Sequence, residues 1–225
     1  MLGQIGLPGG GFNYALGAMG HTGRTPLAVP IPTMPQGRNG VSDFIPCARI
    51  ADMLLHPGET FDYNGAALTY PDIKLVYWGG GNPFHHHQDL SRLRQALARC
   101  DTFVVQDFAW TASARHADIV LPATMSLERE DVGAAGTDPL MIAMRAVARP
   151  YGEARDDHDI FRALTQRLGV EEAFTEGRDP EDWLRHLYEP TRHALQEAGL
   201  PAPEFEMFRA RGEIDLPRRD DDGGR

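Results

Sequence analysis

The chain has 225 residues, of which 42% are hydrophobic, so it is long enough to bury one substantial core, with or without irregular extensions. Its formal net charge of -10 argues against the Lys- and Arg-rich surface that binds nucleic acid or anionic membranes, and we expect no nucleic-acid partner. The two cysteines, Cys47 and Cys100, fit neither a disulfide framework nor a metal-ligand spacing. No run reaches the roughly 18 apolar residues of a membrane span, so membrane insertion is not expected either.

Residues 1–64 are dominated by glycine and proline, and such a composition cannot form a core by itself. The segment holds one convincing helix pattern, over residues 46–55, which ends before Pro57 and Gly58. We interpret 1–64 as a Gly/Pro-rich lead-in segment from an upstream domain.

Residues 65–217 change in character, because short apolar runs now alternate with helical periodicity. This pattern is typical of parallel strands joined by crossover helices. The predicted strands are residues 73–78, 103–106 and 119–121, and the predicted helical segments are residues 90–100, 111–116, 156–168 and 180–198. They predict an α/β fold class: a doubly wound, mostly parallel sheet of the dinucleotide-binding-like kind, with a Gly/Pro-rich N-terminal extension and C-terminal helices. Residues 218–225 are highly charged and are expected to form a disordered tail.

Three consecutive glycines, from Gly79 to Gly81, follow the first predicted strand, and Asn82 and Pro83 come next. In an open α/β sheet, ligands bind beyond the carboxyl ends of the strands, where glycines let backbone N–H groups approach a phosphate. This pattern favours a nucleotide site. Because the spacing is not the Gly-x-Gly-x-x-Gly fingerprint, a simple strand-end turn stays an equal alternative.

The second predicted strand ends in Gln106 and Asp107, where dinucleotide-binding folds place an acidic group on a ribose or base. The alternative is that Asp107 caps a turn. Thr111 either caps the short helix that follows or also turns its hydroxyl toward an anion. Asp138, in the Gly-rich loop 133–139, could reach a purine edge.

Two further patterns favour the less specific interpretation. His85, His86 and His87 are consecutive, so their side chains point in different directions, whereas a metal site needs convergent ligands. We expect no metal ion there, and expect one or two of these histidines to bond to a phosphate or base. Residues 128–131 (Glu-Arg-Glu-Asp) form a charge run, which we interpret as a solvated face rather than as paired acid/base carboxylates.

Several motifs, taken in order, resemble segments of one family. They are residues 3–11, residues 80–89 (Gly-Gly-Asn-Pro-Phe-His-His-His-Gln-Asp), residues 115–124 (Arg-His-Ala-Asp-Ile-Val-Leu-Pro-Ala-Thr), and the stretches 174–177 and 183–184. This series is similar to the molybdopterin oxidoreductases of the biotin sulfoxide, dimethyl sulfoxide and trimethylamine N-oxide reductase type. The likeness runs over essentially the whole chain.

The resemblance implies a cofactor, bis(molybdopterin guanine dinucleotide) molybdenum, at which an S-oxide or N-oxide loses its oxygen while two electrons are transferred. It also implies that the α/β domain of this chain holds one guanosine diphosphate arm of that cofactor. The implied contact residues are Gly81, Asn82 and His86 from the first turn, Gln106 and Asp107 from the second, and Asp138, which would help to select guanine through its N1–H and exocyclic amine.

The family's metal-ligating serine, its earlier pterin-binding segments and its C-terminal cofactor-binding domain have no counterpart in this chain. We therefore expect a fragment that contains no catalytic residue and no metal ligand, and that is inactive without the missing N- and C-terminal domains. Two alternatives stay open: a nicotinamide- or flavin-binding Rossmann-like domain, and a catalytically silent scaffold of the same fold. Residues 35–39 and 128–131 look most like the biotin sulfoxide reductase relatives, which favours a cytoplasmic location, with a periplasmic one also compatible.

Overall fold

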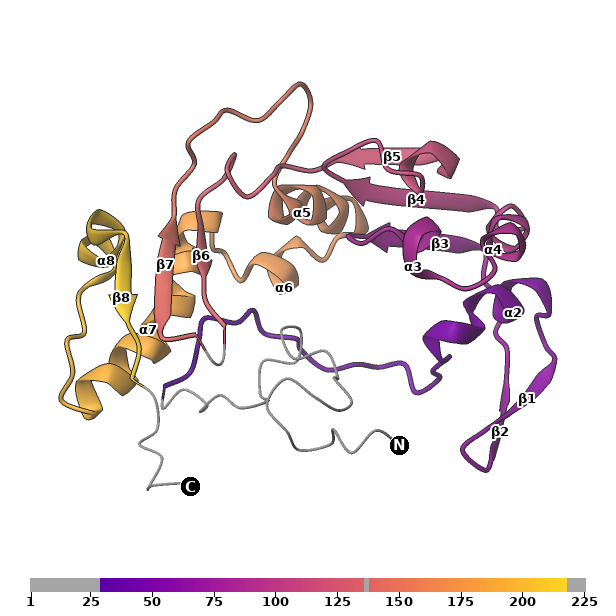
Figure 1. The fold of residues 1–225 in the computed structure, drawn as a ribbon, viewed down its shortest axis with the longest axis horizontal. Helices are drawn as coiled ribbons and strands as arrows, with labels where there is room; N and C mark the ends of the chain where they lie inside the picture. The colour runs from indigo at the N-terminus through magenta and orange to yellow at the C-terminus, as the bar shows by residue number, and fades with distance from the viewer. Residues whose placement is uncertain (1–28, 136–137, 218–225) are drawn as a thin grey trace, which may run out of the picture. The chain divides into compact units, whose positions relative to one another are not determined.

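The computed structural model describes residues 29–135 and 138–217, and they form two compact units (Figure 1). The first unit comprises Gln36–Arg129 and Val147–Glu176. The second comprises Glu130–Ala146, the described chain from Gly177 onward and the described residues before Gln36.

The predicted division into 1–64, 65–217 and 218–225 stays a prediction. The motif at residues 3–11, with the rest of 1–28, and the predicted tail lie outside the described residues.

The first unit contains most of the predicted elements. In chain order they are η1 (Cys47–Arg49), α2 (Ile50–Leu55), β1 (Thr60–Tyr63), β2 (Ala66–Thr69), β3 (Leu75–Gly79), α3 (Pro83–His86), α4 (Leu90–Leu97), β4 (Thr102–Asp107), η2 (Ala114–His116), β5 (Ile119–Pro122), α5 (Asp157–Leu168) and α6 (Glu171–Thr175). The helix predicted over 46–55 corresponds to η1 and α2 together.

A parallel sheet of three strands, in the order β3-β4-β5, forms the centre of this unit. Each strand is a short apolar run whose observed ends lie within two residues of the predicted ones. The crossover that parallel pairing requires is supplied by α4. Leu93 and Leu97 of α4 pack with Phe103 and Val105 of β4 in one buried cluster. The predicted mixed α/β architecture with a parallel sheet is therefore confirmed.

An antiparallel hairpin, β1-β2, precedes the sheet and was not among the predicted elements. Tyr63 lies opposite Ala66, so the loop between the strands is the pair Asn64-Gly65. Both loop residues have positive φ angles, 50° and 81°, as a type I′ turn requires. The Asn-Gly pair is the sequence signal that could have predicted this hairpin.

The second unit consists of an antiparallel sheet and two helices. Its elements are β6 (Asp131–Gly133), β7 (Leu140–Met144), α7 (Pro180–Glu197), α8 (Phe205–Arg211) and β8 (Glu213–Asp215), with the strands in the order β6-β7-β8. The side chains of its buried core are those of Val29, Met141, Ala143, Tyr188, Leu195, Phe205, Phe208, Ile214 and Leu216. The helix predicted over 180–198 is confirmed as α7, whereas none of these strands was predicted. In the described parts of the chain, no helix is long and apolar enough to cross a membrane.

The predicted solvated face at residues 128–131 is wrong in part. Glu128 is half-buried, and its carboxylate accepts the backbone N–H groups of Met125 at 2.9 Å and Tyr151 at 3.1 Å. Glu130 accepts the N–H of Ala146 at 3.2 Å. These carboxylates satisfy backbone donors of neighbouring segments, which a linear charge run does not reveal.

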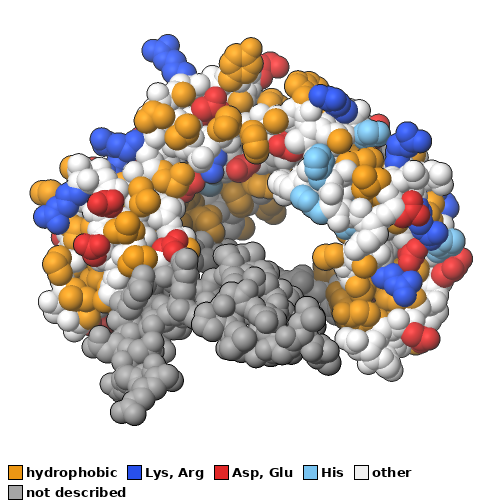
Figure 2. All heavy atoms as spheres, viewed as in Figure 1, with side chains coloured by type: hydrophobic (Ala, Val, Ile, Leu, Met, Phe, Trp, Pro, Cys, Tyr) orange, Lys and Arg blue, Asp and Glu red, His pale blue; other side chains and the backbone are white. Residues whose placement is uncertain are grey.

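The described surface carries both signs of charge. On the face drawn in Figure 2, Lys and Arg side chains are scattered among acidic and hydrophobic ones.

Candidate functional site

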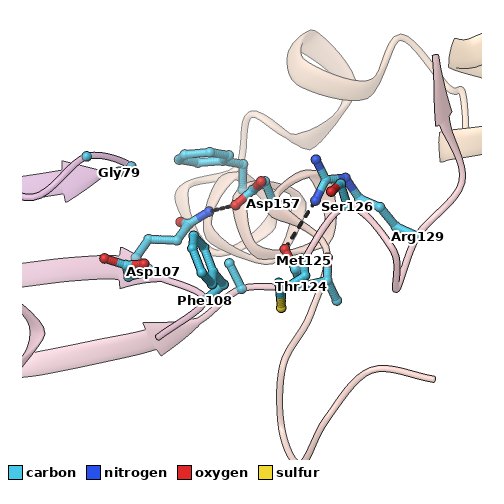
Figure 3. A pocket seen from close by; sticks show the side chains of 13 residues that line it. Gly79, Asp107, Phe108, Thr124, Met125, Ser126, Arg129 and Asp157 are labelled. Atoms are coloured by element: carbon cyan, nitrogen blue, oxygen red, sulfur yellow. Dashed lines mark hydrogen bonds between the residues drawn. The ribbon is translucent and has the colours of Figure 1, made fainter. Parts of the chain in front are cut away.

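A pocket of about 560 Å³ lies at the carboxyl edge of the parallel sheet in the first unit. This volume is within the range of roughly 300–1,000 Å³ that small-molecule sites occupy. Its lining residues are Gly79, Gly80, Gly81, Gln106, Asp107, Phe108, Ala123, Thr124, Met125, Ser126, Arg129, Asp157 and Phe161 (Figure 3). Parallel strands bring their carboxyl ends to one edge, so the turns that follow β3 and β4 meet at this pocket.

The glycine turn is shaped by backbone conformations that favour glycine. Gly80 and Gly81 have φ angles of 74° and 72°, in the left-handed region. The N–H of Gly80 donates to the carbonyl oxygen of Gln106 at 3.2 Å, which joins the ends of β3 and β4. The turn therefore presents backbone without side chains to the pocket.

Gln106 lies at the pocket wall but is only 3% exposed. Its side-chain oxygen accepts a hydrogen bond from the Tyr77 hydroxyl, and its Nε2 donates to Oδ1 of Asp157 at 2.5 Å. Most of its side-chain hydrogen bonding is thus directed at neighbouring side chains. The burial of Tyr77, together with the negative charge of Asp157, raises the pKa of the Tyr77 hydroxyl, so this group is a donor at neutral pH.

Asp107 caps a turn and also lies at the pocket wall, and its contact with a ribose or base stays a prediction. Its carboxylate accepts the Thr111 hydroxyl at 3.0 Å and the N–H of Ala109 at 3.4 Å, so it caps the turn after β4. It also lines the pocket. A carboxylate has about four lone-pair sites, so capping leaves capacity for a ligand. Thr111 caps as well, because its Oγ1 accepts the N–H of Ala114 at 3.3 Å.

Asn82 and His86 follow the glycine turn but are not among the residues that line this pocket. The Asn82 side-chain oxygen accepts the hydroxyl of buried Ser113 at 2.6 Å. Nε2 of His86 accepts the backbone N–H of Asn82 at 3.3 Å. Both side chains therefore stabilise the turn locally, and their contact with a cofactor stays a prediction.

Asp138 belongs to the second unit, between β6 and β7, and its backbone N–H donates to the carbonyl of Ala135 at 3.0 Å. It is not among the residues that line the pocket. Its selection of guanine stays a prediction from the family resemblance.

Sequence reasoning missed two charged residues of the pocket wall, Asp157 and Arg129. The segment after β5 brings Asp157 there: the N–H of Thr124 donates to the carbonyl of Arg155 at 3.0 Å, and its hydroxyl donates to Asp156 at 2.7 Å. Nη1 of Arg129 donates to the carbonyl of Thr124 at 3.1 Å (Figure 3). No local pattern signals these contacts, although Arg129 stands in the charge run interpreted as a solvated face.

The pocket wall offers the groups that a nucleotide requires: a side-chain-free glycine turn, carboxylates for base or ribose donors, and a guanidinium group for phosphate. It does not resemble a metal centre. Across residues 29–135 and 138–217, no group of three or more His, Cys, Asp or Glu side chains is arranged to hold a metal ion.

Comparison with known proteins gives consistent results. A family model described as molybdopterin oxidoreductase matches residues 1–167. The chain is 50% identical to the biotin sulfoxide reductase of Cereibacter sphaeroides over 96% of its own length and 29% of that protein. It is 45% identical to the dimethyl sulfoxide/trimethylamine N-oxide reductase of the same organism, over 96% of this chain and 28% of that protein.

A trimethylamine-N-oxide reductase of Haemophilus influenzae is 45% identical over 92% of this chain and 27% of that protein. The chain thus spans less than a third of the length of these relatives. Among solved structures, acetylene hydratase from Pelobacter acetylenicus matches with a TM-score of 0.50 and 24% identity, over 67% of this chain and 19% of that one, a likeness of fold alone.

Proposed function

The chain belongs to the molybdopterin oxidoreductase family, and from this premise we propose that its strand-edge pocket holds the guanosine diphosphate arm of a molybdopterin guanine dinucleotide cofactor. The observation that carries the proposal is the convergence of Gly81, Gln106 and Asp107, from two adjacent strand ends, on one pocket of nucleotide size.

The proposal includes a doubly wound, dinucleotide-binding-like arrangement of the first unit. Its support is the alternation of side chains along β3, because successive residues of a strand face opposite sides of a sheet. Val76 and Trp78 pack against the cluster that contains α4, whereas the ring of Tyr77 lies 5.9 Å from that of Phe161 in α5.

In this proposal each group has a defined role. The backbone of the glycine turn lies against the diphosphate, since a Cβ there would keep phosphate oxygens from the N–H groups. Arg129 offsets phosphate charge. Asp107 and Asp157 supply carboxylates to the ribose and to the base, and Asp138, Asn82 and His86 add the contacts that the family resemblance implies.

The cofactor supplies the two-electron chemistry, and the residues of this chain bind and orient one arm of it. For the longer protein that carries this stretch, we propose the reduction of an S-oxide or N-oxide. Two electrons and two protons convert the oxide to the sulfide or amine and water. Biotin sulfoxide, dimethyl sulfoxide and trimethylamine N-oxide are the candidate substrates, and the cytoplasm is the proposed location.

Titration calorimetry tests this function. It compares the binding of GDP by the unaltered chain with its binding by the Asp157→Asn and Asp159→Asn variants. Asp159 lies on the same helix but does not line the pocket, so it is a matched control. A charge-assisted hydrogen bond contributes about 1.5–3 kcal/mol, so Asp157→Asn should weaken GDP binding roughly ten- to a hundredfold. Asp159→Asn should leave it unchanged.

Two results would overturn the proposal. One is the absence of GDP binding to the unaltered chain at millimolar nucleotide. The other is equal binding of GDP by both variants, which would show that the nucleotide does not bond to Asp157.

A further inference from the structure

We propose that Tyr77 is a positioning residue for this pocket, whose hydroxyl fixes the Gln106 amide and, through it, the carboxylate of Asp157. The inference rests on the proposed guanosine site, because it concerns how that site's carboxylate is oriented. The three side chains come from β3, β4 and the first turn of α5.

The direction of the hydrogen bonds follows from the chemistry of the partners. The Tyr77 hydroxyl donates to Gln106 Oε1, and the carboxylate of Asp157 accepts from the Gln106 amide nitrogen. The Gln106 amide must therefore turn its oxygen toward Tyr77 and its NH2 toward Asp157, where Nε2 lies 2.5 Å from Oδ1. The reverse orientation would place the amide oxygen against the carboxylate, and neither group can donate a hydrogen bond to the other.

Burial holds this arrangement in place. Gln106 is 3% exposed, so an unsatisfied amide group there would cost free energy that water could not recover. Tyr77 is half-buried, and its ring lies 5.9 Å from the ring of Phe161. Tyr77 therefore cannot leave Gln106 without disturbing the contact between β3 and α5.

The sheet register explains why the hydroxyl reaches Gln106 rather than another group. Gly79, not Tyr77, is the direct neighbour of Gln106 on β3. Gly79 has no side chain, so the space beside Gln106 is open to the diagonal neighbour two residues away, on the same face. A Cβ at Gly79 would lie 3.7 Å from Cε1 of the Tyr77 ring, which places that ring beside the gap.

These bonds affect the orientation of the Asp157 carboxylate, which is exposed and lines the pocket. One of its oxygens is held by Gln106, which limits rotation of the carboxylate and leaves its remaining lone pairs for a ligand. Figure 3 shows the dashed bond that reaches Asp157 at the start of the helix. A fixed carboxylate loses less entropy on binding than a freely rotating one.

The first test needs no ligand. In Tyr77→Phe, hydrogen exchange of the Gln106 side-chain amide, followed by ¹⁵N NMR, should accelerate at least severalfold. The matched control is Tyr188→Phe, which also removes a buried tyrosine hydroxyl bond, here to the carbonyl of Pro203 at 2.7 Å in the second unit. Equal Gln106 exchange in both variants would overturn the proposal.

The second test is a double-mutant cycle with GDP as the titrant. Tyr77→Phe should weaken GDP binding about three- to tenfold, the equivalent of one neutral hydrogen bond of roughly 1 kcal/mol. In a Gln106→Leu background, the same substitution should have no further effect, because Tyr77 acts through Gln106. An equal loss in both backgrounds would contradict the proposed chain of bonds. If the unaltered chain binds no GDP, the proposed function fails, and amide exchange still decides whether Tyr77 positions Gln106.

Discussion

At the scale of single residues, the carboxylates of the first unit differ in whether they line the pocket and in which donors they accept from. Asp107 and Asp157 line the pocket, although each also bonds to a neighbouring side chain. Glu128 does not line the pocket, and its oxygens are engaged by two backbone N–H groups. The groups that a carboxylate contacts thus determine whether its removal changes nucleotide binding or stability.

Removal of Asp107 or Asp138 should lower nucleotide content, while removal of Glu128 should lower stability. In a longer protein with these residues, Asp107→Ala or Asp138→Ala should reduce guanine-nucleotide and molybdenum content, with about a tenfold weakening for each 1.4 kcal/mol lost. Glu128→Ala should leave both contents unchanged, but should cost about 1–2 kcal/mol of unfolding free energy. Metal and nucleotide analysis together with thermal melts separates the two effects, and equal contents in all variants would return Asp107 and Asp138 to the role of turn caps.

The two cysteines should react at different rates. Cys47 is exposed, whereas Cys100 is half-buried. Burial, followed by the charges of Asp101 and Asp118, raises the pKa of the Cys100 thiol. Because only the thiolate is nucleophilic, iodoacetamide at pH 8 should alkylate Cys47 first and Cys100 several times more slowly. Peptide mass spectrometry measures both rates, and equal rates would contradict the burial of Cys100.

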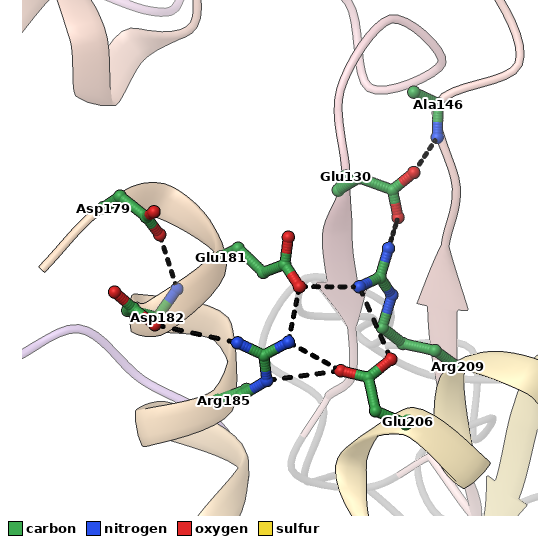
Figure 4. Close-up of polar contacts among 8 residues, drawn as sticks. All are labelled: Glu130, Ala146, Asp179, Glu181, Asp182, Arg185, Glu206 and Arg209. Carbon is green, nitrogen blue, oxygen red and sulfur yellow. Dashed lines mark hydrogen bonds and ion pairs between the residues drawn. The ribbon is translucent and has the colours of Figure 1, made fainter.

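At the scale of elements, ion pairs connect α7, α8 and Glu130, the residue before β6, in the second unit (Figure 4). Arg209 is 20% exposed and lies 3.2 Å from both Glu130 and Glu181. Arg185 pairs with Glu181 at 2.5 Å and with Glu206 at 2.7 Å. The Arg209 guanidinium thus contacts two carboxylates that are distant in sequence, one just before β6 and one in α7.

Loss of Arg209 should destabilise the second unit measurably. Arg209→Met should lower the unfolding free energy by about 1–2 kcal/mol, because the mostly shielded guanidinium group is the shared partner of Glu130 and Glu181. Lys74→Met is the control, since the pair of Lys74 with Asp72 is exposed and contributes little to stability. Urea titrations at low and high salt provide the measurement, and equal losses in the two variants would show that the Arg209 pairs contribute no more than a surface pair.

The packing of α7 on α8 should make stability sensitive to alkaline pH. The ring of Tyr188 stacks on Phe208 with centroids 5.0 Å apart, and burial raises the pKa of its hydroxyl to about 12. The folded state therefore favours the neutral phenol over the unfolded state, in which the pKa is about 10. The stability that the neutral phenol gives the folded state is fully present below pH 10 and is lost as the pH rises through about 12.

The comparison of unaltered protein with Tyr188→Phe tests this dependence. Between pH 10 and about 12, the free energy of unfolding should fall by about 2–3 kcal/mol more in the unaltered protein than in the variant. Urea unfolding at pH 9, 10 and 11 gives the slopes. Parallel slopes in the two proteins would show that the Tyr188 hydroxyl does not titrate with folding.

At the scale of the whole molecule, the chain spans 29% of the biotin sulfoxide reductase that it resembles, and in our proposal its pocket is one part of a larger cofactor site. We expect the 225-residue chain alone to reduce no biotin sulfoxide, dimethyl sulfoxide or trimethylamine N-oxide with a reduced viologen dye. The longer protein should do so once loaded with cofactor. Viologen oxidation by the isolated chain above a no-protein control would contradict this expectation.

Family membership also bears on the alternatives that the residues alone left open. It removes the basis for an ordinary nicotinamide- or flavin-binding domain. Only a measurement of nucleotide binding distinguishes a cofactor-binding domain from the silent scaffold, because a scaffold of the same fold would match the same family.

Local patterns in the sequence determined the parallel sheet and the position of its glycine turn. An apolar run closed by Gly79, and another closed by Gln106 and Asp107, can be read without knowing what lies nearby, since strand formation and turn formation depend on neighbouring residues. The same holds for α7, whose apolar face recurs at helical spacing. The cofactor was not indicated by these local patterns; it was implied by the resemblance of several motifs to a family.

Only the tertiary structure decided which side chains line the pocket. Asp157 and Arg129 reach it through contacts of the chain after β5, and Gln106 turns toward Tyr77 and Asp157. The sheet β6-β7-β8 depends in the same way on a partner about 70 residues away, because Met141 pairs with Ile214. Strands of three to five residues have too short an apolar pattern to be recognised alone, and their pairing is selected by the core that they bury together.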